Sequence, residues 1–181
     1  MEYRMIGTEN LTRALFAHFI RRQEVTKCWR REAGEWVIRD APFTDDWSEK
    51  DYALLLAELR ELLSNGGIVI GAFYKNELKG FASVSGVLFG GRREYLDLTN
   101  LHVSQDMRRH GIGRELFLRA ADIAREHGAK KLYLSAHSAI ESQAFYRAMG
   151  CVEAMEYSAY HVKKEPFDCQ MEYCLDKEGN W

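Results

Sequence analysis

The stretch "SQDMRRHGIGRELFLRAADIA", residues 104–124, carries the most informative pattern in this 181-residue chain. It sets two glycines around one isoleucine, places arginines on both sides of them, and continues directly into apolar residues at helical spacing. That spacing predicts a helix with one buried face, which ends at Gly128. An ordinary turn requires one glycine and no arginines, so the loop before the helix needs a functional explanation.

A Gly-x-Gly loop that opens a helix is suited to bind a diphosphate. Glycine lets the backbone approach a ligand and adopt positive φ, while successive N–H groups and the helix dipole favour an anion. Arg108, Arg109 and Arg114 add forked donors that match phosphate oxygens. A nucleotide P-loop would continue as Gly-Lys-Ser/Thr, whereas Gly113 precedes Arg114, and a dinucleotide fingerprint would carry a third glycine. A surface loop with incidental arginines is the remaining alternative.

The strand before this loop, "REYLDLTNLHV", changes the parity of its apolar residues. Leu96 and Leu98 point to one face of a regular strand, whereas Leu101 and Val103 point to the other. One extra residue between the two pairs would return all four side chains to the same face. The sequence therefore predicts a β-bulge at Thr99-Asn100. The alternative is a central strand buried on both faces, for which parity carries no information.

The rest of the chain alternates between helices and strands. Helices are predicted over residues 12–23, 48–67 and 138–150. Ser48 would cap the second helix, and a Ser138–Glu141 capping box would open the third. A hairpin turning at 75–77 is predicted over residues 68–89, and strands over 130–136, 152–162 and 168–175. The aromatic, acidic segment 32–47, broken by a proline, is predicted to be a loop. This order predicts a mixed α/β sheet layered with helices.

Bulk properties indicate one soluble domain. The chain is 46% hydrophobic and 29% charged, and its net charge of −2 gives no general attraction to nucleic acid or to an anionic membrane. Its amino terminus has no apolar signal core and no segment reaches membrane-spanning length, so a cytoplasmic location is expected. Four scattered cysteines lack metal-ligand spacing and are expected to be reduced thiols, with no metal site.

The pattern Arg-x-x-Gly-x-Gly, at Arg108, Gly111 and Gly113, resembles the acyl-CoA signature of the GCN5-related N-acetyltransferases (GNAT). "LHVSQDMR" is similar to that family's fourth strand and turn, and "AFYRAMGC" is similar to its Phe-Tyr-x-x-x-Gly-Phe segment. The similarity covers roughly residues 95–152. It implies a single GNAT domain over 1–181: a mixed, mostly antiparallel central sheet with a β-bulge and splayed central strands, and helices on both faces.

The resemblance also implies acetyl-CoA as the acyl donor. The open strand edge would pair with the pantetheine arm through main-chain hydrogen bonds, as an added strand does. A backbone N–H freed by the bulge would face the thioester carbonyl as an oxyanion donor. The residues implied in cofactor binding are Leu101, His102, Val103, Arg108, Arg109, His110, Gly111, Ile112, Gly113, Arg114 and Ser142.

Tyr146 and Asp97 are the catalytic residues that the resemblance implies. Tyr146 would act as general acid, because a phenol with a pKa of ~10 stays protonated at neutral pH; simple packing beside Phe145 is the alternative. Asp97 would orient the amine or pass its proton to water. Direct removal of a proton from an ammonium by Asp97 would have to overcome a pKa difference of ~6.5 units, or about 9 kcal/mol. Asp97 could instead merely bond neighbouring backbone, Arg92 or Arg93.

Two positions depart from the family pattern, and the acceptor is left open. Relatives often carry Asn and Ala where this chain has Ala139 and Ser142. Aromatic and acidic residues suit a cationic amine: Trp36, Phe43, Asp45, Asp46 and Trp47, with further acidity from Glu153, Glu156, Glu165 and Asp168. Helix capping, buried tryptophans and solvated strand edges are the alternatives.

The function expected is acetyl transfer from acetyl-CoA to a primary amine of a small molecule, such as streptothricin, an aminoglycoside or a polyamine. A protein or peptide lysine, or an N-terminus, is an alternative acceptor. A non-catalytic acyl-CoA-binding module on the same fold is a further alternative. Relatives often pair as homodimers, so a homodimer is left open for this chain, whose sequence does not determine the oligomeric state.

Overall fold

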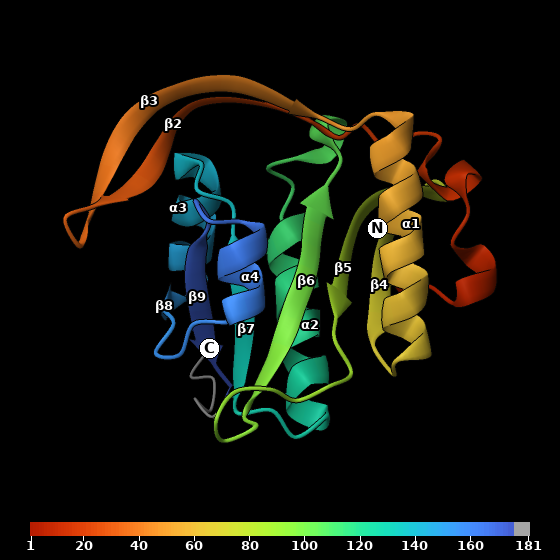
Figure 1. Ribbon diagram of the computed structural model, residues 1–181. Coiled ribbons are helices and arrows are strands. Elements are labelled where there is room, and N and C mark those ends of the chain that lie inside the picture. Colours follow the sequence, from red (N-terminus) through yellow and green to blue (C-terminus); the bar gives the residue numbers. More distant parts are fainter. Residues whose placement is uncertain (176–181) are drawn as a thin grey trace.

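The computed structural model describes residues 1–175, and a seven-stranded sheet with the order β1-β4-β5-β6-β7-β9-β8 forms its centre (Figure 1). The strands are β1 (Glu2–Met5), β4 (Ile68–Tyr74), β5 (Glu77–Val84), β6 (Tyr95–Val103), β7 (Lys131–Ala136), β8 (Val152–Glu153) and β9 (Cys169–Cys174). β6 and β7 are parallel, whereas the other neighbours in this sheet are antiparallel.

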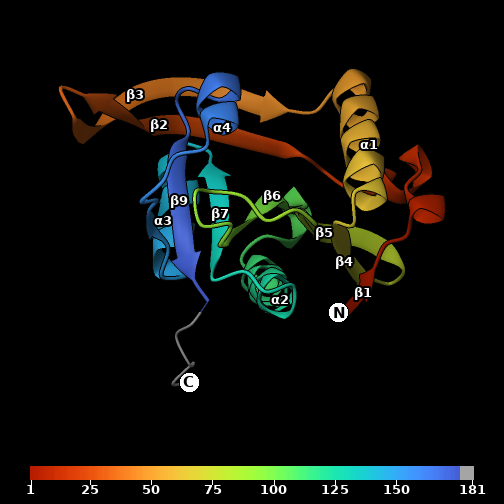
Figure 2. The same ribbon diagram turned by 60° about the horizontal axis from the view of Figure 1, so that its bottom comes forward.

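Helices cover both faces of this sheet. The helices are α1 (Glu49–Ser64), α2 (Ile112–Glu126), α3 (Ile140–Ala148) and the short α4 (Ala159–Lys164). α1 and α4 lie on one face, and α2 and α3 lie on the other (Figure 2). The strands supply both cores: Val69 and Phe81 pack in the core with α1, whereas Ile70 and Ala82 belong to the core with α2. This arrangement confirms the predicted fold class.

The predicted caps and turns explain most of the boundaries. Ser48 caps α1 and forms a capping box with Asp51. The β4–β5 hairpin turns at Lys75 and Asn76, which both have positive φ. Gly128, with a φ of +80°, follows the end of α2. These three boundaries, at the start of α1, the β4–β5 turn and the end of α2, lie where local sequence chemistry predicted them.

Replacing Ser48 with alanine should lower the free energy of unfolding by about 1 kcal/mol, because the first turn of α1 loses its side-chain acceptor. Urea denaturation monitored by circular dichroism would measure the change. Ser64→Ala, at the opposite end of the same helix, is the matched control and should shift stability by no more than ~0.5 kcal/mol. Equal losses in both variants would contradict the capping role.

The helix predicted over residues 12–23 is wrong. A single 3-10 turn, η2 (Arg13–Phe16), brings Phe16 and Phe19 into the core beside α1. The chain then extends, because the Ile20 N–H donates to the Ser104 hydroxyl at 2.9 Å and Arg21 pairs with Asp45. Tertiary contacts override the apolar spacing here.

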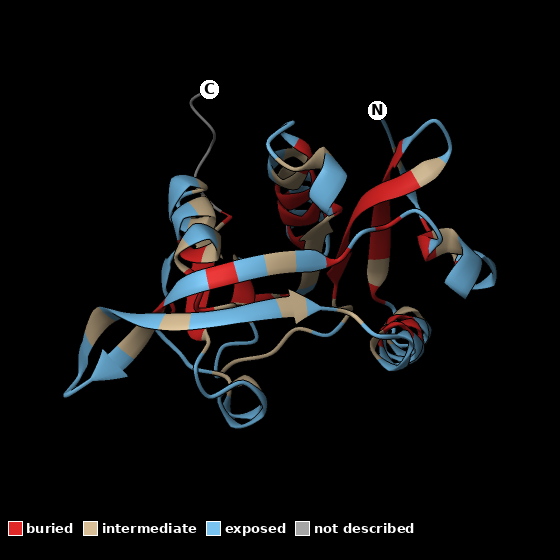
Figure 3. Cartoon of the chain, turned by 90° about the horizontal axis from the view of Figure 1, so that it is seen from above, coloured by how far each residue is buried: buried red, intermediate tan, exposed pale blue. Residues whose placement is uncertain are grey.

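The loop predicted over residues 32–47 is also wrong. The segment forms a turn at Ala33-Gly34 and the strand β3 (Glu35–Asp46), which pairs with β2 (Arg22–Glu32). The two strands make a long arm that crosses over the ends of the sheet strands from α1 toward α3 (Figures 1 and 2). Most of its residues are exposed or half-buried, so the usual alternation of apolar and polar side chains is absent (Figure 3). Pro42 is tolerated because it lies on the outer strand, at a register irregularity.

Two predictions near the carboxyl end need correction. Ser138 does not cap α3: the N-cap is Ala139, and the Ser138 hydroxyl accepts a hydrogen bond from Arg30 at 2.8 Å. The strand predicted over 152–162 consists of the two-residue β8 followed by α4. Ser158 caps α4 by accepting from the N–H of His161.

Candidate active site

The sheet opens between β6 and β7. The two strands pair only from Tyr95 to Asp97, opposite Lys131 to Tyr133, and β7 then continues beside β9. Within residues 1–175, the β6 edge that faces away from β5 therefore has no strand partner after Asp97. A cleft of about 1370 Å³ lies at this opening and is lined by β6, α1, α3, α4, the loop before α2 and the base of the arm.

The predicted bulge is confirmed at Thr99. Val84 of β5 pairs with Leu98 and Ser83 pairs with Asn100, so Thr99 is the additional residue. Its hydroxyl lies 2.6 Å from the Ser83 hydroxyl, to which the Asn100 amide also donates at 2.9 Å. The bulge is thus fixed by side-chain hydrogen bonds beside the cleft.

The glycine loop presents its backbone to the cleft. Gly111 is the N-cap of α2 with a φ of +78°, and a Cβ added there would meet no atom within 4 Å. Arg109 also has positive φ, so the chain curls before the helix begins. Ten of the eleven residues implied in cofactor binding line the cleft; His110 does not, and its ring bonds the carbonyl of Arg108 at 2.8 Å.

The charge at this end of the cleft is positive and partly desolvated. Burial and the nearby guanidinium of Arg21 lower the pKa of Arg108, and Asp45 partly offsets them. The Arg108 Nε–H donates to the carbonyl of Val103 at 3.3 Å, which fixes the side chain along the end of β6. An anion that neutralised this site would relieve the repulsion between Arg21 and Arg108.

His102 is a packed neutral ring despite lining the cleft. Its centroid lies 4.8 Å from that of Trp47 and 5.3 Å from that of Phe81. Burial, reinforced by Arg21 and Arg108, lowers the pKa of His102 to about 3. His102 therefore supplies packing and backbone to this wall rather than charge.

Tyr146 lines the same cleft from α3, with Phe145 beside it at 5.1 Å between ring centroids. Burial raises the pKa of its phenol above the usual value, and the neighbouring groups Cys151 and Asp168 raise it further. The hydroxyl therefore stays protonated across the neutral range. The position of Tyr146 fits the role of general acid. It also fits the alternative role, in which Tyr146 only packs beside Phe145.

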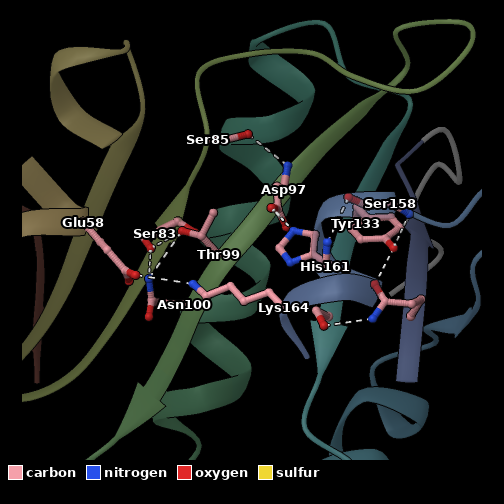
Figure 4. A network of polar contacts seen from close by, with 12 residues as sticks. Glu58, Ser83, Ser85, Asp97, Thr99, Asn100, Tyr133, Ser158, His161 and Lys164 are labelled. Atoms are coloured by element: carbon pink, nitrogen blue, oxygen red, sulfur yellow. Dashed lines mark hydrogen bonds and ion pairs between the residues drawn. The ribbon is translucent and has the colours of Figure 1, made fainter. Parts of the chain in front are cut away.

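Asp97 is bonded to a residue that sequence reasoning did not identify. Its Oδ2 lies 2.5 Å from Nε2 of His161, which comes from α4, and the two side chains point toward each other (Figure 4). Both side chains are largely buried, at 14% and 12% exposure. Asp97 thus pairs with His161 rather than with Arg92 or Arg93.

The residues suggested for the acceptor pocket divide into two groups. Asp45, Trp47, Glu165 and Asp168 line the cleft; burial, with Glu165 beside it, raises the pKa of Asp168 to about 7. The others do not line the cleft and have their own partners: Trp36 bonds Glu153, Phe43 packs against the His137 ring at a tilt, Asp46 pairs with Arg22, and Glu156 accepts from the Gly91 N–H.

An ion pair spans the cleft between α4 and α1. Lys164 of α4 reaches Glu58 of α1 at 3.3 Å, passing in front of β6 (Figure 4). Sequence reasoning missed this bridge and His161 because it treated 152–162 as a strand. The signal was present: Ser158 is a cap residue, basic Lys163 and Lys164 occupy the last turn, and Pro166 follows.

Solved structures with the same fold are acetyltransferases. A nourseothricin acetyltransferase superposes with a TM-score of 0.68 at 19% identity, covering 96% of this chain and 98% of that one. The PaiA N-acetyltransferase from Thermoplasma acidophilum, in complex with coenzyme A, gives 0.59 at 18% identity, with 96% and 98% coverage. An aminoglycoside 6'-N-acetyltransferase complexed with coenzyme A gives 0.55 at 15% identity, with 74% and 84% coverage.

The sequence itself matches the model of the Acetyltransferase (GNAT) family over residues 31–151. This match includes the bulged strand β6, the glycine loop, α2 and α3, which carry the motifs described above. The match extends over more than half of the chain, and the fold agrees with it. The chain therefore belongs to the GNAT acetyltransferase family.

Proposed function

We propose that this protein transfers the acetyl group of acetyl-CoA to a primary amine of a small molecule by direct attack. The observation that carries the proposal is the cleft at the opening of β6 and β7, where the glycine loop, the free β6 edge and Tyr146 share one volume. The diphosphate would bind the loop, pantetheine would pair with β6, and the thioester would lie beside the bulge.

The chemistry then needs few groups. The amine nitrogen attacks the thioester carbonyl carbon, and a backbone N–H at the bulge stabilises the developing oxyanion. As the tetrahedral intermediate collapses, the C–S bond breaks and Tyr146 donates its proton to the departing thiolate. Asp97 lies where the strands part and would orient the amine.

The acceptor side of the cleft favours a small cation. Glu24, Glu58, Glu165 and Asp168 line it together with the aromatic ring of Tyr160. The Lys164–Glu58 bridge spans the cleft and the base of the arm lines it, which suits a free small molecule better than a lysine within a folded protein. The nourseothricin and aminoglycoside enzymes of the same fold support this class.

Thiol release from acetyl-CoA against a panel of amines would test the proposal. The panel should contain a streptothricin, an aminoglycoside, a polyamine and a lysine peptide. Turnover with one of the first three, at least ~10-fold above the peptide in kcat/KM, is expected. Turnover with the peptide alone would reassign the acceptor. No thiol release with any amine, despite acetyl-CoA binding, would refute the proposal.

We further propose that residues 1–181 form one acetyltransferase domain acting in the cytoplasm. The four free cysteines fit a reducing compartment. Within residues 1–175, no helix is long and apolar enough to cross a bilayer.

A further inference from the structure

The Asp97–His161 pair lies at the point where the sheet opens. Asp97 is the last residue of β6 that pairs with β7, opposite Tyr133. The His161 ring stacks on Tyr133, with centroids 5.7 Å apart and an interplanar angle of 27°. Its Nε2 is bonded to Asp97, so packing and a hydrogen bond fix the ring together. The imidazole is thereby held in one orientation at the cleft wall.

This orientation leaves one ring nitrogen of His161 without a hydrogen-bond partner among residues 1–175. An ionised carboxylate only accepts hydrogen bonds, so Nε2 of His161 carries the hydrogen and Nδ1 of the neutral ring is a bare acceptor. Nδ1 is buried without a hydrogen-bond partner among residues 1–175, and so is Oδ1 of Asp97. Two unpaired buried acceptors on one pair are costly and require donors. An amine supplies N–H donors of that kind.

The pair also solves the proton problem that Asp97 alone does not. An ammonium has a pKa of ~10.4 and a carboxylate one of ~3.9, so the two differ by ~6.5 units. Imidazole has a pKa of ~6.5, so it differs from the ammonium by only ~4 units. Burial lowers the pKa of His161, yet the bond to Asp97 and the charges of Asp97 and Glu165 outweigh it, so its pKa lies above the usual value. Because the pKa of His161 is raised, the difference between it and the pKa of the ammonium becomes smaller still.

The other groups facing His161 do not reverse this balance. Tyr133 faces the ring from β7, and its buried phenol has a pKa raised to about 12, so it stays neutral. Tyr160 touches the ring edge from α4 itself. The ammonium of Lys164 lowers the pKa of His161 less than Asp97 raises it. Asp168 interacts with His161 as a further nearby acid.

We propose that His161 is the base that takes the proton from the acceptor amine during attack, and that Asp97 is the positioning residue that holds its ring. The bound ammonium first loses one proton through Nδ1 of His161 to solvent, which frees the lone pair that attacks. When the C–N bond forms, the nitrogen becomes positively charged again and releases a second proton to Nδ1. The C–S bond breaks, and the thiolate receives the proton of Tyr146. His161 then returns its proton to solvent, and Tyr146 recovers one. This inference rests on the proposed acetyl transfer.

A purely structural role must be distinguished, because His161 and Lys164 both anchor α4 across the cleft. His161→Gln keeps an N–H group able to reach Asp97 but cannot accept a proton. We expect kcat at saturating amine to fall roughly 100-fold, with unchanged acetyl-CoA affinity. The acid limb of the kcat profile, where activity falls as pH drops through the raised pKa of His161, should disappear. His18→Gln, an exposed histidine, is the matched control and should match wild type.

Two further measurements separate catalysis from anchoring. Added imidazole should restore activity to His161→Ala, which loss of an anchor would not allow. Asp97→Asn removes the carboxylate that raises the pKa of His161, so its remaining activity should show an acid limb shifted to lower pH. Either result supports the base role even if His161→Gln folds poorly.

The outcomes also separate this inference from the proposed function. One result would overturn the role of His161 and leave acetyl transfer intact. In it, the wild type turns over, and His161→Gln keeps the acid limb of the kcat–pH profile and at least one third of the wild-type kcat. A wild-type protein that binds acetyl-CoA but turns over no amine would overturn both.

Discussion

Tyr146→Phe should lower kcat for acetyl transfer by roughly 1000-fold while changing acetyl-CoA affinity by less than ~2-fold. The hydroxyl is the only group removed, and Tyr146 lines the cleft from which the thiolate would depart. Burial raises the pKa of Tyr146 above its usual value. The phenol is therefore protonated at all pH values below about 10 and should impose no alkaline limb there. Thiol-release kinetics and calorimetric titration with acetyl-CoA would measure the two quantities.

Tyr173→Phe is the matched control for this variant. Tyr173 packs on the same core ring as Tyr146, with its centroid 5.2 Å from that of Phe117, but it does not line the cleft. Removing its hydroxyl should leave kcat within ~2-fold of wild type. If Tyr146→Phe and Tyr173→Phe had equal rates, Tyr146 would be a packing residue and another group would protonate the thiolate.

Gly111→Glu should weaken coenzyme A binding by roughly 100-fold, or ~2.7 kcal/mol. The new carboxylate would lie at the opening turn of α2, where the diphosphate is expected, and like charges ~4 Å apart repel by about 4 kcal/mol near a protein surface. A Cβ added at this position would meet no protein atom within 4 Å, so the loss is expected to come from charge and backbone strain rather than from a clash at the backbone.

Gly128→Glu isolates the charge effect from the strain. Gly128 has a φ of +80°, close to the +78° of Gly111, and a Cβ there would also meet nothing within 4 Å. It follows the opposite end of the same helix and does not line the cleft. Its variant should lose comparable stability but keep coenzyme A affinity. Equal affinities in Gly111→Glu and Gly128→Glu would exclude the glycine loop as the diphosphate site.

The bulge in β6 and the glycine loop before α2 could be predicted from neighbouring residues in the sequence. The parity change between Leu98 and Leu101 located the bulge, because one extra residue is the simplest way to keep both faces consistent. The paired glycines located the start of α2, where a positive φ and open backbone are needed. Both features are encoded within a few consecutive residues, so tertiary structure did not override them.

The arm and the acceptor side could not be predicted in this way. The β2–β3 arm exposes most of its surface, so its strands lack the periodicity that identifies a strand with one buried face. His161 joins Asp97 across 64 residues of sequence, and nothing local to either residue indicates that contact. The helix signals at Ser158 and Pro166 would have placed α4 but not its partner strand.

The opening turn of α2 is proposed to bind the diphosphate of acetyl-CoA and so to place the thioester beside the bulge in β6. A crystal structure of the protein with acetyl-CoA would show both contacts. We expect diphosphate oxygens within ~3 Å of main-chain nitrogens of residues 109–113, and the thioester carbonyl beside Thr99-Asn100. A diphosphate bound elsewhere, with the thioester away from the parting of β6 and β7, would contradict it.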